Sequence, residues 1–185
     1  IDPEDFPRPS EQAIAAARAN LGLATDAQVV VGIFRLSEEK APLTFVEVCG
    51  RVLNNEPRAH VLLVGVGPLR DVVSARVAEL GLTDRFQILG RRSDVNTLLC
   101  LSNVLLLTSL KEGMPNVVME AQLLGVPVVA TDAGGTSEAV HDGRTGLIRD
   151  IGDVEGLTEA CLRMLRSETE AKDMGAAGRS RALMF

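Results

Sequence analysis

The sequence contains no tryptophan and no tyrosine, and aromatic residues make up only 3% of it although 46% of the chain is hydrophobic. The core must therefore be built from valine, leucine, isoleucine and alanine. Strands that are buried on both faces of a parallel sheet consist of such aliphatic runs, because helices cover both faces. The composition thus favours helices packed on a parallel sheet.

The chain is also poor in cysteine, in clustered cations and in long apolar runs. Its three cysteines, Cys49, Cys100 and Cys161, are isolated within predicted helices, which argues against a disulfide framework or a zinc site and favours buried small hydrophobic residues. A net charge of -6 without a dense Lys and Arg segment argues against a nucleic-acid partner. No apolar run reaches about 18 residues and no basic segment opens the chain, so neither a membrane span nor a signal peptide is visible. A cytoplasmic location fits these features.

Short aliphatic runs alternate with longer helical patterns, as in repeated βαβ units. Strands are predicted over residues 28–34, 60–66, 86–89, 104–107 and 127–131, with a short edge strand over 146–149. Helices are predicted over residues 10–21, 43–53, 69–80, 95–100, 116–124, 136–141, 154–165 and 168–183. This order predicts an α/β fold: a three-layer αβα Rossmann-like domain with a parallel sheet of about six strands.

Ligands of such sheets bind at the carboxyl ends of the strands, so the turns that follow the strands are the candidate sites. These turns are residues 35–40, 65–68, 90–94 and 109–116. The sequence has no Walker phosphate loop, no Gly-x-Ser-x-Gly and no His-Glu-x-x-His, and the run VGVGPLR lacks the third glycine of a dinucleotide fingerprint. Kinase, hydrolase, metalloprotease and dinucleotide-binding functions therefore lose support.

The run LKEGMPNVVME places Glu112 and Glu120 eight positions apart, with Gly113 and Pro115 between them. Proline favours the first helical position, so a helix is predicted to begin at Pro115. The amides of residues 116–118 then lack partners within the helix and offer a phosphate site at the positive end of its dipole. Carboxylates beside a phosphate need hydroxyl donors, which sugars supply. A nucleotide sugar combines a ribose diol, a diphosphate and a hexose, and so satisfies all three parts.

Simpler explanations exist for each pattern by itself. Acids favour helix starts, so Glu112 as a cap and Glu120 on a solvated face would explain the pair. Arg35 and Lys40, directly after the first predicted strand, are placed to converge on a diphosphate, or are ordinary surface charges. Arg91 lies where a base would bind, beside residues that would also serve as helix caps.

Together these segments resemble the C-terminal, donor-binding domain of the family 4 (group 1) retaining glycosyltransferases, which have the GT-B fold. The resemblance rests on RLSEEK, VLLVGVGPLR, FQILGRRSDV, SLKEGMPNVVMEAQLLGVPVVATDAGGTSEAV and DGRTGLI, which follow one another in the family's order and cover nearly the whole chain. Three positions depart from the family pattern: Phe34 and Ala41 stand where glycine is common, and Val66 stands where an acid is common.

The resemblance implies a role for each site residue. Arg35 and Lys40 would bind the donor diphosphate, and Glu112 would contact the transferred sugar; these three form the expected catalytic set. The expected substrate-binding residues are Glu120 on the ribose hydroxyls, the backbone of Gly113, Met114, Pro115, Asn116 and Val117 on sugar and phosphate, and Gly90 and Arg91 beside the base.

The resemblance also implies an activity. The expected enzyme transfers a hexosyl group from a nucleoside diphosphate sugar to a saccharide or lipid-linked acceptor, in polysaccharide or glycolipid biosynthesis and without a metal or other cofactor. A UDP-sugar is the favoured donor and a GDP-sugar the alternative. A nucleotide-sugar epimerase or phosphorylase of the same architecture, or a non-catalytic nucleotide-binding module, stays an alternative to this function.

The family's two-domain architecture sets the expected boundaries. Residues 1–10 are interpreted as an interdomain linker and residues 11–185 as the donor-binding domain. The acceptor-binding N-terminal domain is expected to be missing and the last helix to be truncated at Phe185, so this piece by itself is expected to be inactive or nearly so. Peripheral membrane association of the full-length protein would come from the other domain.

Overall fold

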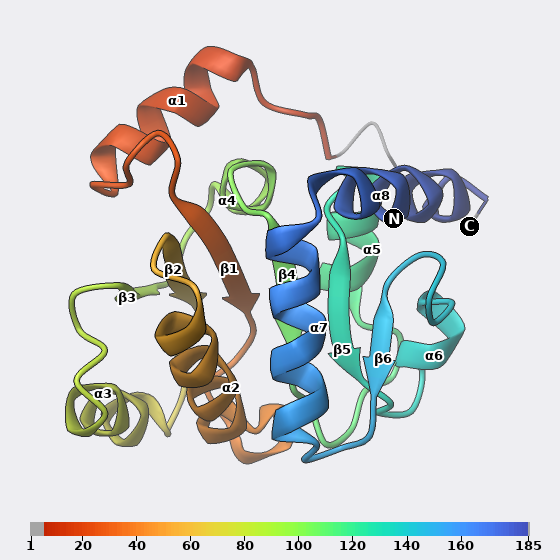
Figure 1. The fold of residues 1–185 in the computed structure, drawn as a ribbon. Helices are drawn as coiled ribbons and strands as arrows, with labels where there is room; N and C mark the ends of the chain where they lie inside the picture. Colours follow the sequence, from red (N-terminus) through yellow and green to blue (C-terminus); the bar gives the residue numbers. More distant parts are fainter. Residues whose placement is uncertain (1–5, 185) are drawn as a thin grey trace.

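A computed structural model describes residues 6–184, which form one parallel sheet covered by helices on both faces (Figure 1). The sheet has six strands in the order β3-β2-β1-β4-β5-β6, and all of its pairings are parallel. Residues 1–5 of the expected linker and Phe185 lie outside the described part. The strands are β1 (Gln28–Ile33), β2 (Ala59–Val64), β3 (Phe86–Gly90), β4 (Val104–Leu107), β5 (Val128–Thr131) and β6 (Leu147–Arg149).

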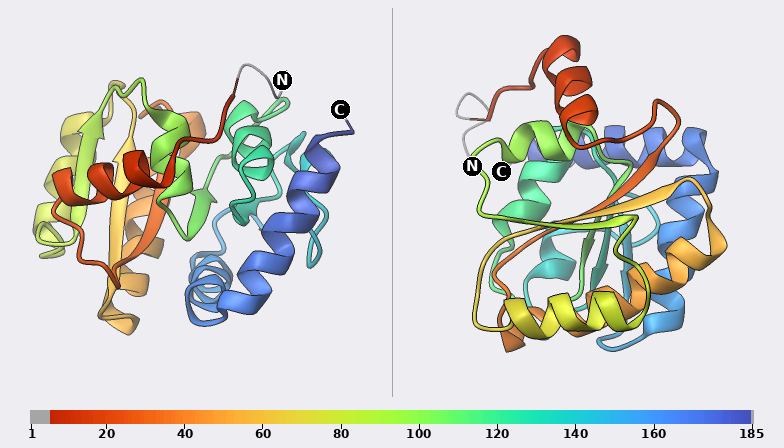
Figure 2. Two further views of the ribbon diagram at one scale, coloured as in Figure 1. Left: turned by 90° about the horizontal axis from the view of Figure 1, so that it is seen from above. Right: turned by 90° about the vertical axis from the view of Figure 1, so that its left-hand side faces the viewer.

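The helices form the two outer layers. One face of the sheet carries α2 (Pro42–Asn55) and α7 (Val154–Arg166), with α3 (Arg70–Glu79) beside α2; the other carries α4 (Val95–Cys100) and α5 (Asn116–Leu123), with α6 (Thr136–Ala139) beside α5 (Figure 2). α1 (Glu11–Asn20) packs on α4, and α8 (Glu168–Ala182) packs on α5. The predicted three-layer αβα fold is therefore confirmed.

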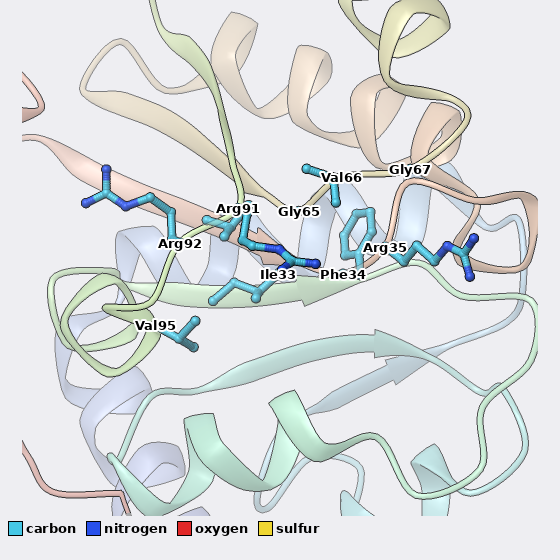
Figure 3. A pocket seen from close by; sticks show the side chains of 10 residues that line it. Ile33, Phe34, Arg35, Gly65, Val66, Gly67, Arg91, Arg92 and Val95 are labelled. Carbon is cyan, nitrogen blue, oxygen red and sulfur yellow. The ribbon is translucent and has the colours of Figure 1, made fainter.

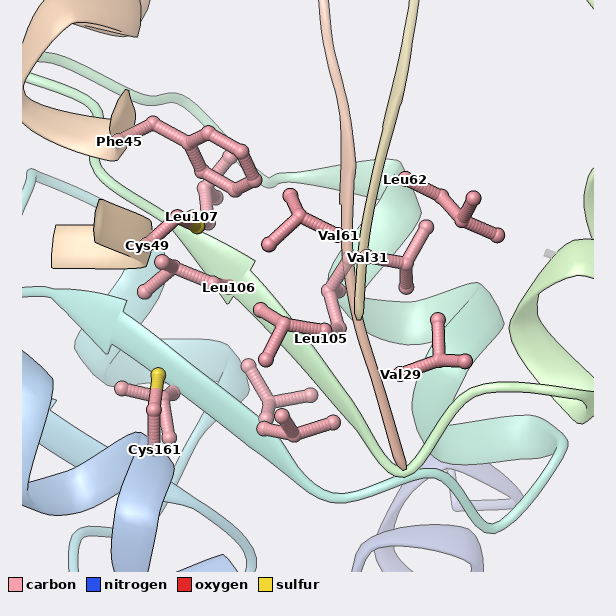
Figure 4. Packing of buried hydrophobic residues seen from close by; sticks show 14 of the residues in the cluster. Val29, Val31, Phe45, Cys49, Val61, Leu62, Leu105, Leu106, Leu107 and Cys161 are labelled. Atoms are coloured by element: carbon pink, nitrogen blue, oxygen red, sulfur yellow. The ribbon is translucent and has the colours of Figure 1, made fainter. Parts of the chain in front are cut away.

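The core is aliphatic, as the composition requires. Side chains of β1, β2 and β4 such as Val31, Val61 and Leu105 are fully buried between the two helical layers (Figure 4). Cys49 of α2 and Cys161 of α7 lie in the same core, where burial raises the pKa of Cys161 to about 12. Both thiols are therefore neutral and pack as small hydrophobic side chains, as predicted, whereas Cys100 is only partly buried.

Most predicted elements agree with the structure to within one or two residues, and the differences have local causes. β2 ends at Val64 because Gly65 adopts a φ of 138°, and a Cβ on Gly65 would lie 1.9 Å from the carbonyl oxygen of Phe34. Only glycine permits this approach of the two turns. α3 begins at Arg70, one residue later than predicted, because Leu69 is its N-cap. A short 3-10 helix, η2 (Glu38–Lys40), was not predicted.

The turn between η2 and α2 is strained at Ala41, whose φ of 44° and ψ of 55° are left-handed. This conformation costs an L-residue other than glycine roughly 1–2 kcal/mol. Thr108, which directly follows β4, holds this turn, because its hydroxyl lies 3.2 Å from the carbonyl oxygens of both Lys40 and Ala41. The departure from the family's glycine at this position thus has a structural cost.

Ala41→Gly should stabilise the protein by about 1 kcal/mol or less. The relief of left-handed strain, about 1–2 kcal/mol, exceeds the entropy that glycine adds to the unfolded chain, about 0.4–1 kcal/mol. Denaturant unfolding measures the change. Ala75→Gly, at an exposed site within α3, is the matched control and should lose about 1 kcal/mol; a loss of stability in both variants would contradict the account of Ala41.

Candidate functional site

The strand order reverses between β1 and β4, and this switch point is where open parallel sheets bind ligands. Two cavities open at this end of the sheet, of about 610 Å³ and about 330 Å³. Both are lined by Ile33, Phe34 and Arg35, so they adjoin along the carboxyl end of β1. We call them the larger and the smaller cavity, and together they form the groove.

The larger cavity lies between the turns that follow β1, β2 and β3 (Figure 3). The Arg91 side chain extends over the carboxyl end of β1, and within residues 6–184 its guanidinium has no hydrogen-bond or ion-pair partner. Arg92 points away and binds Asp94 through two hydrogen bonds of 2.8 and 2.7 Å. This contact lowers the pKa of Asp94 and replaces the helix cap that the sequence suggested there. Of the two arginines that follow β3, Arg91 is thus the one left to face a ligand.

The smaller cavity brings together charged residues from two loops. Arg35 and Lys40 come from the loop after β1, and Glu112 comes from the loop after β4. Lys40 Nζ lies 2.6 Å from Glu112 Oε1, although 72 positions separate the two residues. In the described part of the chain Arg35 makes no hydrogen bond or ion pair through its guanidinium. The smaller cavity therefore presents one unpaired cation, Arg35, and one cation, Lys40, that shares its charge with a carboxylate.

Glu112 is held more firmly than a residue of an exposed loop. Its side chain is only 8% exposed, and the Ser109 hydroxyl donates a hydrogen bond of 2.6 Å to the same Oε1 that Lys40 contacts. Sequence reasoning did not single out Ser109; the signal was a hydroxyl at a strand end, three positions before the predicted acid. The interpretation of Glu112 as a simple helix cap is wrong, because its side chain binds Lys40 and Ser109.

A pair of glycines fixes the backbone of the same loop. A Cβ on Gly135 would lie 1.9 Å from the carbonyl oxygen of Gly113, and one on Gly134 would lie 2.3 Å from that of Glu112. The Gly135 amide also donates to the Glu112 carbonyl at 3.2 Å. Side chains at these two glycines would displace the loop that carries Glu112. The turn before α6, which contains both glycines, therefore helps to position Glu112.

The start of α5 differs from the prediction by one residue. Pro115 is the N-cap, with an extended conformation at φ -75° and ψ 103°, and the helix begins at Asn116. The Val118 amide donates to the Pro115 carbonyl at 3.0 Å in a tight first turn. Among the described residues the amides of Asn116 and Val117 find no acceptor, so two free amides, not three, face the groove.

Glu120 lies about a turn and a half inside α5 and lines neither cavity. Its carboxylate is partly buried, and burial raises its pKa. No hydrogen bond or ion pair from residues 6–184 compensates for this burial. An unpaired, partly desolvated acid is typical of functional sites. Its contact with ribose stays a prediction.

The predicted site residues thus fall into two groups. Gly90 ends β3 and, like Gly113 and Glu120, does not line the groove; the Gly90 carbonyl accepts the Gly65 amide at 2.8 Å. The predicted site residues that line the groove are Arg35, Lys40, Arg91, Glu112, Met114, Pro115, Asn116 and Val117, and their roles toward a ligand stay predictions.

None of the helices in the described part of the chain is long and apolar enough to cross a membrane. No group of three or more His, Cys, Asp or Glu side chains in residues 6–184 is placed to hold a metal ion.

Comparison with known proteins agrees with this architecture. Residues 14–181 match the family model of the glycosyl transferases group 1. The Vi polysaccharide biosynthesis protein VipC/TviE of Salmonella typhi is 38% identical over 137 residues, which are 74% of this chain and 24% of that protein.

Solved structures also resemble the whole chain. Anabaena Alr3699/HepE in complex with UDP-glucose superposes with a TM-score of 0.92 at 26% identity, over 100% of this chain and 51% of the other. The C-terminal domain of the group 1 family glycosyl transferase LpcC from Francisella tularensis has a TM-score of 0.84 at 18% identity, over 100% of this chain and 97% of the domain, which shows the shared fold.

The chain spans between 24% and 50% of the length of its curated relatives. The family match covers most of the chain, and the solved C-terminal domain has nearly the same extent. The chain belongs to the group 1 glycosyl transferase family, and its fold is that of the C-terminal domain of a GT-B glycosyltransferase.

Proposed function

We propose that this chain is the donor-binding domain of a retaining glycosyltransferase that uses a UDP-sugar. The observation that carries the proposal is the groove at the switch point, which gathers Arg35, Lys40, Glu112 and the two free amides of α5. Cations and amides suit a diphosphate, and a carboxylate suits sugar hydroxyls. The UDP-glucose complex of the similar HepE protein supports this class of donor.

The donor is proposed to lie along the carboxyl end of β1. The base would occupy the larger cavity beside Arg91, and the diphosphate would lie near Arg35, Lys40 and the start of α5. The sugar would then reach Glu112 in the smaller cavity. Glu120 would accept hydrogen bonds from the ribose hydroxyls, which gives its unpaired carboxylate the donors that the protein does not supply.

In the proposed reaction the bond between the anomeric carbon and the diphosphate oxygen breaks, and a bond to an acceptor hydroxyl oxygen forms with retention of configuration. The acceptor loses its proton, and the nucleoside diphosphate leaves with an additional negative charge. Arg35, Lys40 and the amides of α5 would stabilise that charge, which is the main electrostatic demand of the transfer. We propose that no metal ion takes part.

The acceptor and the setting are proposed more broadly. The similarity to a Vi polysaccharide biosynthesis protein favours a saccharide or lipid-linked acceptor in polysaccharide or glycolipid assembly. The proposed location is the cytoplasm, with any membrane association mediated by parts of the protein outside this chain. Binding assays with uridine, guanosine and adenosine diphosphate sugars would identify the base, and release of nucleoside diphosphate without an acceptor would favour an epimerase or hydrolytic activity instead.

Lys40→Met should weaken UDP binding by about 10- to 100-fold. One N–H of the Lys40 ammonium points to Glu112, which leaves two for the diphosphate, and a charge-assisted hydrogen bond contributes about 1.5–3 kcal/mol. Isothermal titration calorimetry measures the loss. Lys111→Met, which removes an exposed cation from the same loop as Glu112, is the control and should bind UDP as the wild type does. Equal losses of affinity in both variants would show that Lys40 contributes only its charge and makes no specific contact with the diphosphate.

Glu120→Gln should stabilise the free protein near neutral pH and weaken UDP binding. The pKa of Glu120 is raised by burial, so its ionised form opposes folding once the pH rises above the ordinary glutamate value of about 4.3. The difference in melting temperature between variant and wild type should therefore shrink as the pH falls below that value.

The affinity of Glu120→Gln for UDP is measured by calorimetry. Loss of a charged acceptor for the ribose hydroxyls should cost about 1.5–3 kcal/mol of UDP affinity. Titration with 2′,3′-dideoxy-UDP provides the control, because variant and wild type should bind it equally. A Glu120→Gln variant that binds UDP as tightly as the wild type would exclude the ribose contact.

A further inference from the structure

The two carboxylate oxygens of Glu112 have different surroundings. Oε1 accepts from the Lys40 ammonium and from the Ser109 hydroxyl, both at 2.6 Å. Oε2 has no partner within residues 6–184, although Glu112 lines the smaller cavity. One oxygen is therefore engaged by the protein, and the other is left for a ligand.

The two donors to Oε1 differ in how firmly they are held. Lys40 has a long flexible side chain that is 21% exposed, and it is also the cation proposed to bind the diphosphate. Ser109 lies two residues after the end of β4 and is completely buried. Its carbonyl accepts a 2.6 Å hydrogen bond from the buried hydroxyl of Thr131, the last residue of β5. The backbone that carries the Ser109 hydroxyl is thus anchored to the sheet, whereas the Lys40 ammonium is free to move toward a phosphate.

We propose that Ser109 is a positioning residue that holds Glu112 Oε1 while a donor is bound, so that Oε2 faces the hydroxyls of the transferred sugar. This inference rests on the proposed function. When Lys40 shares its charge with the diphosphate, Ser109 remains as the fixed donor to Oε1. Without it, the Glu112 carboxylate can rotate about its terminal side-chain bond, because that torsion has broad minima.

The contribution of Ser109 should appear in the part of the affinity that comes from the sugar. In Ser109→Ala, calorimetry should show that the affinity for UDP-glucose falls about tenfold more than the affinity for UDP. This loss is smaller than that expected for a directly removed charged hydrogen bond, because Ser109 acts on the sugar only through Glu112. Ser109→Cys keeps a side chain of similar size with a weaker donor and should show the same selective loss. It decides the question if the alanine variant does not fold.

A double-mutant cycle separates positioning from a general structural effect. Because Ser109 acts through Glu112, Ser109→Ala should change the preference for UDP-glucose over UDP little when Glu112→Gln is already present. Ser102→Ala is the matched control. Ser102 lies near the opposite end of β4, and its hydroxyl donates a hydrogen bond of 2.6 Å to the Leu98 carbonyl. That variant should keep the wild-type preference.

The outcomes distinguish this inference from the function on which it rests. A folded wild-type protein that binds neither UDP nor UDP-glucose would overturn the proposed donor site itself. A wild type that binds both, with an unchanged preference in Ser109→Ala and Ser109→Cys, would overturn only the role of Ser109. A loss of preference that persists in full in the Glu112→Gln background would do the same, since Ser109 would then act independently of Glu112.

Discussion

The contact between Lys40 and Glu112 joins the loops that follow the two central strands, and the geometry of the groove depends on it. Reversal of strand order between β1 and β4 brings these loops together. Removing one partner from a mostly buried ion pair leaves an uncompensated charge, which is costly. The pair therefore fixes the distance between the proposed phosphate-binding and sugar-binding residues before any ligand arrives, and such preorganisation is what stabilisation of developing charge requires.

Backbone strain and close backbone packing occur on both sides of that contact. Ala41 adopts a left-handed conformation directly after Lys40, held by the Thr108 hydroxyl. On the other side, the backbone of Gly134 and Gly135 packs against the loop that carries Glu112 more closely than any side chain would allow. Strain and close packing near a site are expected where the fold must define a functional geometry.

The fold was largely predictable because its signals are local. Aliphatic runs of four to seven residues mark buried strands, and β4 was predicted with its observed bounds, Val104–Leu107. The place of Pro115 was predicted less accurately, since it is the N-cap of α5 instead of its first helical residue. The partners of Lys40, Ser109 and Asp94 depend on rotamers and on contacts between distant segments, which no local pattern encodes. The roles of Arg35, Glu112 and Glu120 came from a family resemblance, and their ligand contacts stay predictions.

The central claim is that a nucleotide sugar lies along the carboxyl end of β1, between the loops joined by Lys40 and Glu112. Amide NMR titration with UDP-glucose tests it most directly. We expect the largest shifts at residues 35–40, 65–67, 90–92 and 109–117, with the amides of Asn116 and Val117 among them because they are free to bind phosphate. Shifts confined to the amino ends of β1 and β4, around Gln28 and Asn103, would contradict the account, as would the absence of shifts at saturating ligand.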